Sequence, residues 1–298
     1  IALEEMGRSL LCAPFFSTVV LAGNAIIHSG NEDAKAALLP GIADGSTIAT
    51  MALAEASGRW DAEGVTVEAS GTGEGATITG EKMFVTDGGT ANLFVVAARA
   101  EGGIHLYTVD GDATGLSREN LSTMDQTRKQ ARITFDGTPA SHLCDTNDFS
   151  YIAQILDLAA VALANEQVGG AQFVMDMAVQ YAKDRQQGRS LSGTQYPDQP
   201  ADPLLVHPDI RRMLLTMRAF TEGGRALSVW IGRNIDIRDR SNNPQARKEA
   251  DDLVQLLTPL VKSYLSETGH DAAQMAVQVY GGHGYIWENG VEQYARDA

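Results

Sequence analysis

The spacing of apolar residues changes twice along the chain. In residues 1–46 apolar side chains recur every three or four positions, as at Met6 and Leu10, and this spacing predicts helices. A short helix is predicted over residues 33–39. We expect Pro40 to end it, because a proline inside a helix removes a backbone hydrogen bond.

Between about residues 47 and 143 the pattern is different. Valine, threonine and glycine dominate, and short alternating or apolar runs are separated by glycine-rich turns. Several strands without helices between them predict an antiparallel sandwich or barrel. The runs that predict strands are residues 65–69, 76–79, 94–98, 104–109 and 132–135.

From about residue 150 the helical spacing returns. The predicted helices cover residues 152–184, 210–233 and 245–279. Residues 188–207 are rich in Gly, Pro, Ser and Asp, and we expect them to form a loop. Within the second helix Glu222 and Arg225 are three positions apart, which predicts an ion pair.

The order helices, strands, helices predicts an α+β fold with three parts. These are a partial N-terminal helical domain over 1–46, a middle β domain over 47–143 and a C-terminal helical domain over 150–298. Residues 1–6 have the pattern of a helix interior, so we expect the chain to be part of a longer protein.

Composition narrows the class of function. With 44% hydrophobic and 20% charged residues, the chain is an ordinary globular protein. A formal net charge of −15 argues against a nucleic-acid or anionic-membrane partner, because both favour a basic face. We expect Cys12 and Cys144 to be inert thiols, and the six histidines show no spacing typical of a metal site.

Residues 81–89 (EKMFVTDGG) lie between two predicted strands. Taken by itself, the segment is typical of a strand that ends in a turn. Its functional interpretation rests on Phe84 and Thr86, an aromatic and a hydroxyl two positions apart. An isoalloxazine ring stacks on an apolar or aromatic face and takes hydrogen bonds at its polar edge.

Two further segments lie at the ends of predicted helices. Arg185 ends the helix over 152–184, where an arginine commonly acts as a partner for the helix dipole. The last helix breaks after Gln278 at Gly281 and Gly282. Paired glycines permit φ > 0 and leave bare main chain, which suits a planar cofactor or a neighbouring subunit.

Together these segments resemble the acyl-CoA dehydrogenase family, flavoproteins that desaturate acyl thioesters. The resemblance implies a fold with N-terminal helices, a middle antiparallel β-sandwich or barrel and a C-terminal helical bundle. It implies FAD as the cofactor, with Phe84 and Thr86 lining the flavin. It also implies that Arg185, Gln278, Gly281 and Gly282 reach FAD across a dimer.

The resemblance is a mosaic of two subgroups. The insert with Leu191-Ser192-Gly193 and the proline-rich run that follows is similar to 3-(methylthio)propanoyl-CoA dehydrogenases. The first ~175 residues resemble actinobacterial acyl-CoA dehydrogenase subunits that form hetero-oligomers and act on steroid or other bulky acyl-CoA substrates.

The implied reaction is an α,β-dehydrogenation of an acyl-CoA thioester, with electrons passed to an electron-transfer flavoprotein in the cytoplasm. In the family the catalytic base is commonly a glutamate in a Tyr-Glu-Gly-Thr motif that would follow Ala298, so no catalytic residue is predicted within this chain. A carboxylate removes the α-proton only if donors polarise the thioester carbonyl in a dry pocket.

Several positions depart from the family pattern. Ala54 stands where members place a hydroxyl that bonds the flavin, and Trp60 stands where they place a serine. Ala159 and Ala160 stand where some members carry a glutamate and an arginine. Two hypotheses follow, an FAD-dependent dehydrogenase, with a flavin oxidase as a variant, or a non-catalytic partner subunit of a hetero-oligomer.

Overall fold

The computed structural model describes residues 1–70, 74–145 and 149–298, and the chain divides into two compact units. The barrel unit is Cys12–Ala159. The helical unit combines Ile1–Leu11 with Ala160–Ala298. Over the described part of the chain, no helix has both the length and the apolar character that a membrane span requires.

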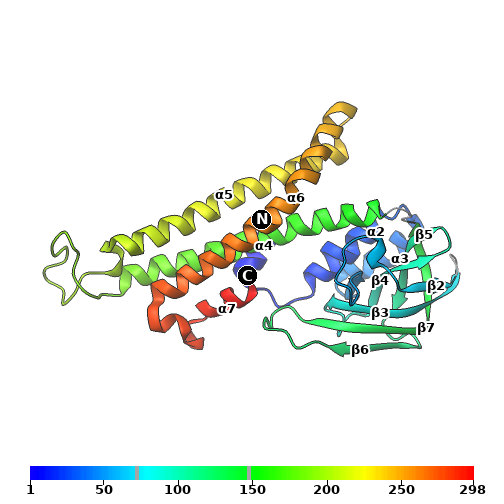
Figure 1. Cartoon of the computed structure of the whole chain (residues 1–298), viewed down its shortest axis with the longest axis horizontal. Coiled ribbons are helices and arrows are strands. Elements are labelled where there is room, and N and C mark those ends of the chain that lie inside the picture. Colours follow the sequence, from blue (N-terminus) through cyan, green and yellow to red (C-terminus); the bar gives the residue numbers. More distant parts are fainter. Residues whose placement is uncertain (71–73, 146–148) are drawn as a thin grey trace. The chain divides into compact units, whose positions relative to one another are not determined.

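The barrel unit is built on one seven-stranded sheet. Pairings run from β4 to β2, β3, β7 and β5, and β5 pairs again with β4, so these strands close on themselves (Figure 1). Closure leaves β1 beside β4 and β6 beside β7. The strands are β1 Ala49–Ala52, β2 Glu68–Ser70, β3 Glu74–Thr86, β4 Leu93–Ala100, β5 Gly103–Asp110, β6 Leu116–Asn120 and β7 Gln130–Asp145.

The predicted α+β class with a middle barrel is confirmed, with one refinement. Two pairings, β1 with β4 and β2 with β4, are parallel, and the other strand pairs are antiparallel. Sequence analysis did not predict β1 or β6. All four residues of β1 are buried, whereas β6 is largely exposed, so neither shows the alternation that signals a strand.

Strand β4 explains why part of the barrel has a continuous apolar run in the sequence. Successive residues belong alternately to two cores: Phe94, Val96 and Ala98 to the interior of the barrel, Val95 and Ala97 to its outer face. The outer core also holds Ile26 from α2 Asn24–His28 and Ile152 from the start of α4 Ser150–Asp184. A strand buried on both faces carries apolar residues at every position.

The helices that cover the outer core are η1 Phe16–Gly23, α2 Asn24–His28 and α3 Glu32–Asp44. The prediction that Pro40 ends the third helix is wrong, because α3 continues through it to Asp44. Leu38, Leu39 and Ile42 of this helix pack against the outer core, and we infer that this packing offsets the lost hydrogen bond. A short turn, η2 Ala62–Gly64, completes the unit.

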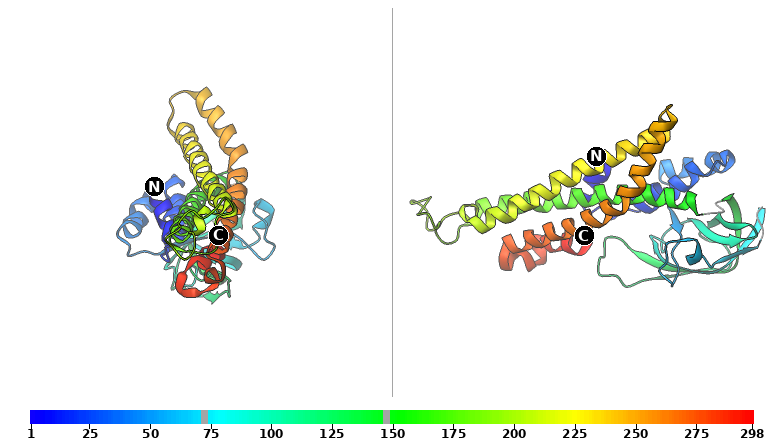
Figure 2. Two further views of the ribbon diagram at one scale, coloured as in Figure 1. Left: turned by 90° about the vertical axis from the view of Figure 1, so that its left-hand side faces the viewer. Right: turned by 45° about the horizontal axis from the view of Figure 1, so that its top comes forward.

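Three long helices form the helical unit, and Figures 1 and 2 show them side by side. They are α4 Ser150–Asp184, α5 Pro208–Arg240 and α6 Pro244–Tyr280, close to the predicted ranges. Residues 150–159 of α4 belong to the barrel unit. The shorter elements are α1 Ala2–Arg8, η3 Leu204–Val206, η4 Gly281–Tyr285, η5 Trp287–Asn289 and α7 Val291–Asp297.

Helix α1 joins this unit although it lies far from the long helices in sequence. A side chain at Gly7 or Gly169 would collide with the backbone of the facing helix, so α1 crosses α4 backbone to backbone. Arg225 donates to Glu4 at 2.6 Å. The predicted Glu222–Arg225 pair is therefore wrong: Arg225 is drawn to α1, and Glu222 pairs with Arg218 at 2.8 Å.

A buried ion pair joins the loop after β1 to β3. The Lys82 side chain is 0% exposed, and its Nζ donates to Glu55 Oε1 at 2.7 Å and to the Leu53 carbonyl at 3.0 Å. Glu55 also accepts from the Thr66 and Val67 backbone amides and from the Thr66 hydroxyl. These contacts give each buried charge a partner.

The ionisation of the pair follows from burial and these bonds. Burial alone would raise the pKa of the Glu55 carboxyl. The groups that donate to it, led by Lys82, lower the pKa by a larger amount, so the net pKa lies below its ordinary value. Burial lowers the pKa of Lys82 to about 8, although Glu55 opposes that shift. Both groups are therefore mainly charged at neutral pH.

Asp202 orders the loop between α4 and α5. Its carboxylate is fully buried and accepts from the backbone amides of Ser190 (2.9 Å), Gln195 (3.2 Å) and Tyr196 (2.8 Å), and from Arg189 Nη1 at 3.3 Å. Burial raises the pKa of Asp202, but these donors lower it more, to about 2. The loop was predicted from its composition, whereas this internal bonding was not.

We expect Lys82→Met to destabilise the protein by about 3–5 kcal/mol, because it leaves the Glu55 charge buried without a cation. The double variant Lys82→Met with Glu55→Gln should recover part of the loss, since no charge remains buried. Denaturant unfolding of the single and double variants measures both effects. Lys129→Met, at an exposed position of the same unit, is the control; a loss for Lys82→Met no larger than the control's would contradict this role.

We expect Asp202→Asn to make the loop over 186–207 several-fold more sensitive to limited proteolysis at pH 7, because the carboxylate that organises it is lost. In the parent protein the unfolded carboxyl takes its proton near 3.8 and the folded one near 2. The stability that Asp202 contributes should therefore fall as the pH drops from about 4 to about 2, a slope the variant lacks. Asp198→Asn, exposed in the same loop, should change neither measurement.

Candidate functional site

Phe84 lies at an irregular point of strand β3. Lys82 pairs with Ile133 of β7 and Val85 pairs with Ala131, so β3 carries one extra residue between them. Phe84 has φ +55°, a conformation that is a clear outlier for a bulky side chain, and its side chain is 50% exposed. Bulges re-aim side chains and are common beside active sites, and stored strain often marks a functional position.

Thr86 follows two positions later on the same strand and is half-buried. Its carbonyl accepts a hydrogen bond from the Thr50 hydroxyl of β1 at 2.6 Å, which fixes this end of β3. Ala54 is held against the same strand, because its carbonyl accepts from the Met83 amide at 2.8 Å. The barrel unit therefore brings Phe84 and Thr86, which both lie on β3, close to Ala54 in the loop after β1.

Other positions singled out in the sequence have simpler surroundings. Trp60 is 62% exposed, next to Arg59, which pairs with Asp61 at 2.7 Å. Ala159 lies on α4 and is buried. Cys144 is half-buried, and burial raises the pKa of its thiol to about 11, consistent with an unreactive group.

Arg185 directly follows the last residue of α4. Its amide donates to the Tyr181 carbonyl, and its carbonyl accepts from Leu204, whose neighbour Pro203 follows the buried Asp202. The backbone at Arg185 is therefore fixed by the ordered loop. Its side chain is exposed, and within residues 1–70, 74–145 and 149–298 it makes no hydrogen bond or ion pair. A guanidinium in this state can receive an anionic group.

The end of α6 lies beside the end of α4. Tyr181 of α4 stacks on Tyr280 of α6 with ring centroids 4.1 Å apart, and the Tyr181 hydroxyl lies 3.3 Å from His283 Nδ1. Gln278, two residues before the last residue of α6, is exposed. The stacked pair therefore brings the Arg185 and Gln278 ends of the two helices together.

The two glycines after α6 leave the main chain open. Gly281 has φ +58° and ψ −136°, a combination reserved for glycine, and a side chain there would meet no atom within 4 Å. Gly282 is equally open. This backbone can be approached closely by a flat or charged group, which agrees with the sequence-based expectation for Gly281 and Gly282 without testing it.

The predicted site residues thus form two groups in different units of the chain. Phe84 and Thr86 belong to the barrel unit. Arg185, Gln278, Gly281 and Gly282 belong to the helical unit. The bulge at Phe84 and the Tyr181–Tyr280 stack were not found by sequence reasoning, because both depend on pairing between distant segments.

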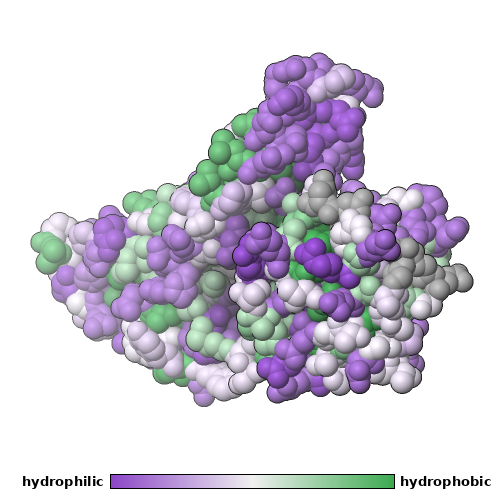
Figure 3. Space-filling view, turned by 45° about the vertical axis from the view of Figure 1, so that its right-hand side comes forward, coloured by the Kyte–Doolittle hydropathy of each residue, from purple (hydrophilic) through white to green (hydrophobic). Residues whose placement is uncertain are grey.

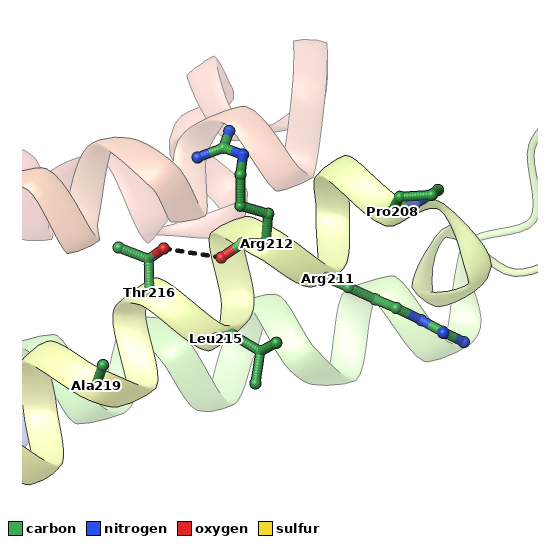
Figure 4. A pocket seen from close by; sticks show the side chains of 6 residues that line it. All are labelled: Pro208, Arg211, Arg212, Leu215, Thr216 and Ala219. Carbon is green, nitrogen blue, oxygen red and sulfur yellow. Dashed lines mark hydrogen bonds between the residues drawn. The ribbon is translucent and has the colours of Figure 1, made fainter.

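A separate surface hollow of about 590 Å³ runs along the start of α5 and is lined by Pro208, Arg211, Arg212, Leu215, Thr216 and Ala219 (Figure 4). The two arginine side chains point apart. Arg211 donates to the Leu205 carbonyl at 2.8 Å, and Arg212 pairs with Asp209 at 2.9 Å. None of the predicted site residues lines this hollow, and both guanidinium groups already have acceptors.

Models of two protein domains match most of this chain. The model for the acyl-CoA dehydrogenase C-terminal domain matches residues 149–298, and the model for the acyl-CoA dehydrogenase middle domain matches residues 50–138. The 3-methylmercaptopropionyl-CoA dehydrogenase of Ruegeria pomeroyi is 32% identical over 92% of this chain. The chain spans half the length of that relative.

The Ruegeria relative agrees with the 3-(methylthio)propanoyl-CoA subgroup of the resemblance, and a solved structure agrees with the steroid subgroup. A variant of the Tcur3481-Tcur3483 steroid ACAD is 26% identical, with a TM-score of 0.76 over 98% of this chain and 72% of that one. A glutaryl-CoA dehydrogenase from Mycobacterium smegmatis in complex with FADH2 is 19% identical, with a TM-score of 0.78 over 95% of this chain and 68% of that one, and it shows the shared fold alone.

The predicted acyl-CoA dehydrogenase-like architecture is confirmed by these matches. Together with the barrel, the three long helices and the matching domain models, they show that this chain belongs to the acyl-CoA dehydrogenase family.

Proposed function

We propose that the protein of which this chain is part is an FAD-dependent acyl-CoA dehydrogenase that introduces a double bond between Cα and Cβ of an acyl-CoA thioester. The observation that carries the proposal is the conformation of Phe84, a half-exposed aromatic side chain held at φ +55° on a bulge. Strained backbone of this kind persists where surrounding contacts hold it in place, and it clusters at functional sites. Family membership supports the same reaction.

The residues of both groups fit a flavin dinucleotide. An exposed aromatic face at Phe84 and a hydroxyl at Thr86 suit the ring and its polar edge. Arg185 offers a guanidinium for the diphosphate, and the open main chain at Gly281 and Gly282 permits close approach. When bound, FAD supplies the acceptor for a hydride from the β-carbon.

Each residue then has a defined task. Phe84 would cover one face of the ring and keep water away from it, and Thr86 would donate a hydrogen bond at the ring's edge. The Thr50 hydroxyl holds the Thr86 carbonyl at 2.6 Å and thereby fixes the direction of β3. Ala54 lacks the hydroxyl common in the family, so one hydrogen bond worth about 0.5–1.5 kcal/mol is missing.

The proposed base is the glutamate that the family resemblance puts after Ala298, and the proposed electron acceptor is an electron-transfer flavoprotein in the cytoplasm.

We also propose that the protein works as an oligomer, because Arg185, Gln278, Gly281 and Gly282 would contact the FAD of a neighbouring subunit. Exposed apolar residues support this: Val229 and Trp230 on α5, and Leu256, Leu260 and Tyr264 on α6. In Figure 3 the connected ends of α5 and α6 have a hydrophilic tip, with apolar surface on one flank of the pair.

A second candidate function is a non-catalytic partner subunit of a hetero-oligomeric acyl-CoA dehydrogenase. Ala54 favours it, because the missing hydroxyl weakens flavin binding within the chain's own barrel. Anaerobic mixing of the flavin-loaded protein with acyl-CoA and an artificial electron acceptor separates the two candidates. Acceptor reduction by the protein alone supports the dehydrogenase, and reduction only after a sister chain is added supports the partner subunit.

We expect Phe84→Gly to lower the flavin content of the purified protein severalfold while its free energy of unfolding, measured on flavin-free samples, stays within about 1 kcal/mol. Relief of the left-handed backbone gains about 1–2 kcal/mol. The freedom of glycine costs about 0.5–1 kcal/mol, and the lost half-buried ring costs about 1 kcal/mol. Tyr196→Ala removes a similarly exposed aromatic as a control; unchanged flavin content in Phe84→Gly would refute its role.

We expect Arg185→Ala to lose flavin as well, and mixing of variants tests whether the contact crosses subunits. In a heterodimer of Phe84→Gly and Arg185→Ala chains, one site collects both defects and the other is intact, so about one flavin per heterodimer should return. If Arg185 instead served its own chain's cofactor, every site would carry one defect and no flavin would return. Arg233→Ala, another exposed arginine of the helical unit, is the control.

A further inference from the structure

A cluster at one edge of the barrel unit has no part in the proposed flavin chemistry. It consists of His105 on β5 and His142 and Asp145 on β7, whose ligand atoms all lie within 4.8 Å of one another. The two histidines are 37 positions apart, so their spacing in the sequence did not reveal the cluster. Pairing of the two strands brings them together.

A bulge makes the cluster possible. His105 pairs with Asp145 and Tyr107 pairs with His142, and between these pairs β7 carries one extra residue relative to β5. On a regular strand, residues three apart such as His142 and Asp145 point to opposite faces. The extra residue turns both side chains to one side, in the way that bulges re-aim side chains near binding sites.

The separations are close to those of a tetrahedral metal site. His105 Nδ1 and His142 Nε2 lie 3.4 Å apart. Two nitrogens bound to zinc at about 2.0–2.1 Å with tetrahedral angles lie about 3.3–3.4 Å apart. Asp145 Oδ1 lies 2.6 Å from the first nitrogen and 2.8 Å from the second. Its side chain is 58% exposed, so it has room to withdraw by about 0.6 Å and admit an ion.

The surroundings of His105 also favour an ion. The residue is 4% exposed, and its second ring nitrogen, Nε2, lies 3.3 Å from the Glu101 carbonyl. A neutral imidazole has one N–H, so it cannot donate both to Glu101 and to Asp145. With a metal on Nδ1, the proton sits on Nε2 and points to the carbonyl, the arrangement usual for metal-bound histidines.

The ring of His142 is held in place by an aromatic neighbour. The buried Tyr107 ring meets it edge to face, with centroids 5.6 Å apart. Two ligands are therefore oriented by packing and hydrogen bonding, while the third remains adaptable. Two imidazoles and one carboxylate form a donor set that suits Zn²⁺ better than Mg²⁺ or Ca²⁺, which prefer oxygen ligands.

We propose that His105 Nδ1, His142 Nε2 and the Asp145 carboxylate bind one Zn²⁺ ion per chain, with water in the fourth position. The ion ties the end of β7 to β5, where the barrel closes. By linking the two strands the ion stabilises the barrel. No residue of the predicted flavin site belongs to the cluster, so the ion has no part in the flavin chemistry. The proposal is independent of the acyl-CoA reaction.

The test uses the full chain after treatment with a chelator, with ZnCl₂ as the only added ligand. We expect titration calorimetry to give about one site per chain, and thermal unfolding to shift upward with zinc concentration, because the ion binds only the folded protein. Co²⁺ in place of Zn²⁺ should give the intense visible absorption of a tetrahedral site. The absence of zinc binding by the parent protein would overturn the proposal.

Variants locate the ion. Asp145→Asn and His142→Gln keep a polar side chain of similar size at partly exposed positions, and each should weaken zinc binding by at least about 10-fold. His28→Gln, an exposed histidine of the same unit, should leave binding unchanged. Equal zinc affinity in all three variants would mean adventitious surface binding and would also overturn the proposal. Phe84→Gly should bind zinc normally, so failure of the flavin proposal would be seen separately.

Discussion

The Glu55–Lys82 ion pair is the constraint on which the barrel side of the proposed flavin site depends. It joins the loop after β1 to β3 at the residue directly before Met83 and the bulge, and its two charges are buried among backbone donors and acceptors. A pair that is satisfied in this way permits little sliding of the strand, because any shift would leave a buried charge unbonded. The bulge therefore forms at one place, and the strained residue is always Phe84. A hydrophobic contact in the same position would hold the strand less specifically, since it lacks directional bonds.

On the helical side, order comes from polar groups at helix ends. Asp202 gathers three backbone amides in a loop that would otherwise lack regular structure, and the loop in turn bonds the Arg185 carbonyl. The Tyr181–Tyr280 stack then sets the end of α6 beside the end of α4. In both units, residues outside the proposed FAD contacts determine where the residues of those proposed contacts lie. This division between fixed supports and open contact residues is what a preorganised binding site requires.

Sequence reasoning succeeded where a single local pattern decides the outcome. The long helices repeat their apolar stripe many times, so α4 and α6 were located to within two residues at each end, and the run over 94–98 identified β4. The prediction for α5 found its start but stopped at 233, short of its end at Arg240. It failed where distant segments decide. Pro40 remains inside α3 because the helix packs on the barrel. Arg225 donates to Glu4, more than two hundred positions away, and not to Glu222. Bulges on β3 and β7 depend on register between strands, which no local pattern encodes. The roles of Phe84, Thr86, Arg185, Gln278, Gly281 and Gly282 stay predictions.

The crossing of α1 over α4 affects how the chain folds during synthesis. The barrel unit is one continuous stretch, Cys12–Ala159, so it can form as soon as that stretch has left the ribosome. The helical unit needs both α1, which precedes the barrel unit in the chain, and α7, which follows it: the Tyr294 hydroxyl donates to the Arg8 carbonyl at 2.7 Å. Until then the close backbone contact at Gly7 and Gly169 lacks part of its support. The nascent chain therefore passes through an interval in which a finished barrel is preceded by a helix, α1, that still lacks part of its packing, the state in which chaperone capture or misassembly is most expected.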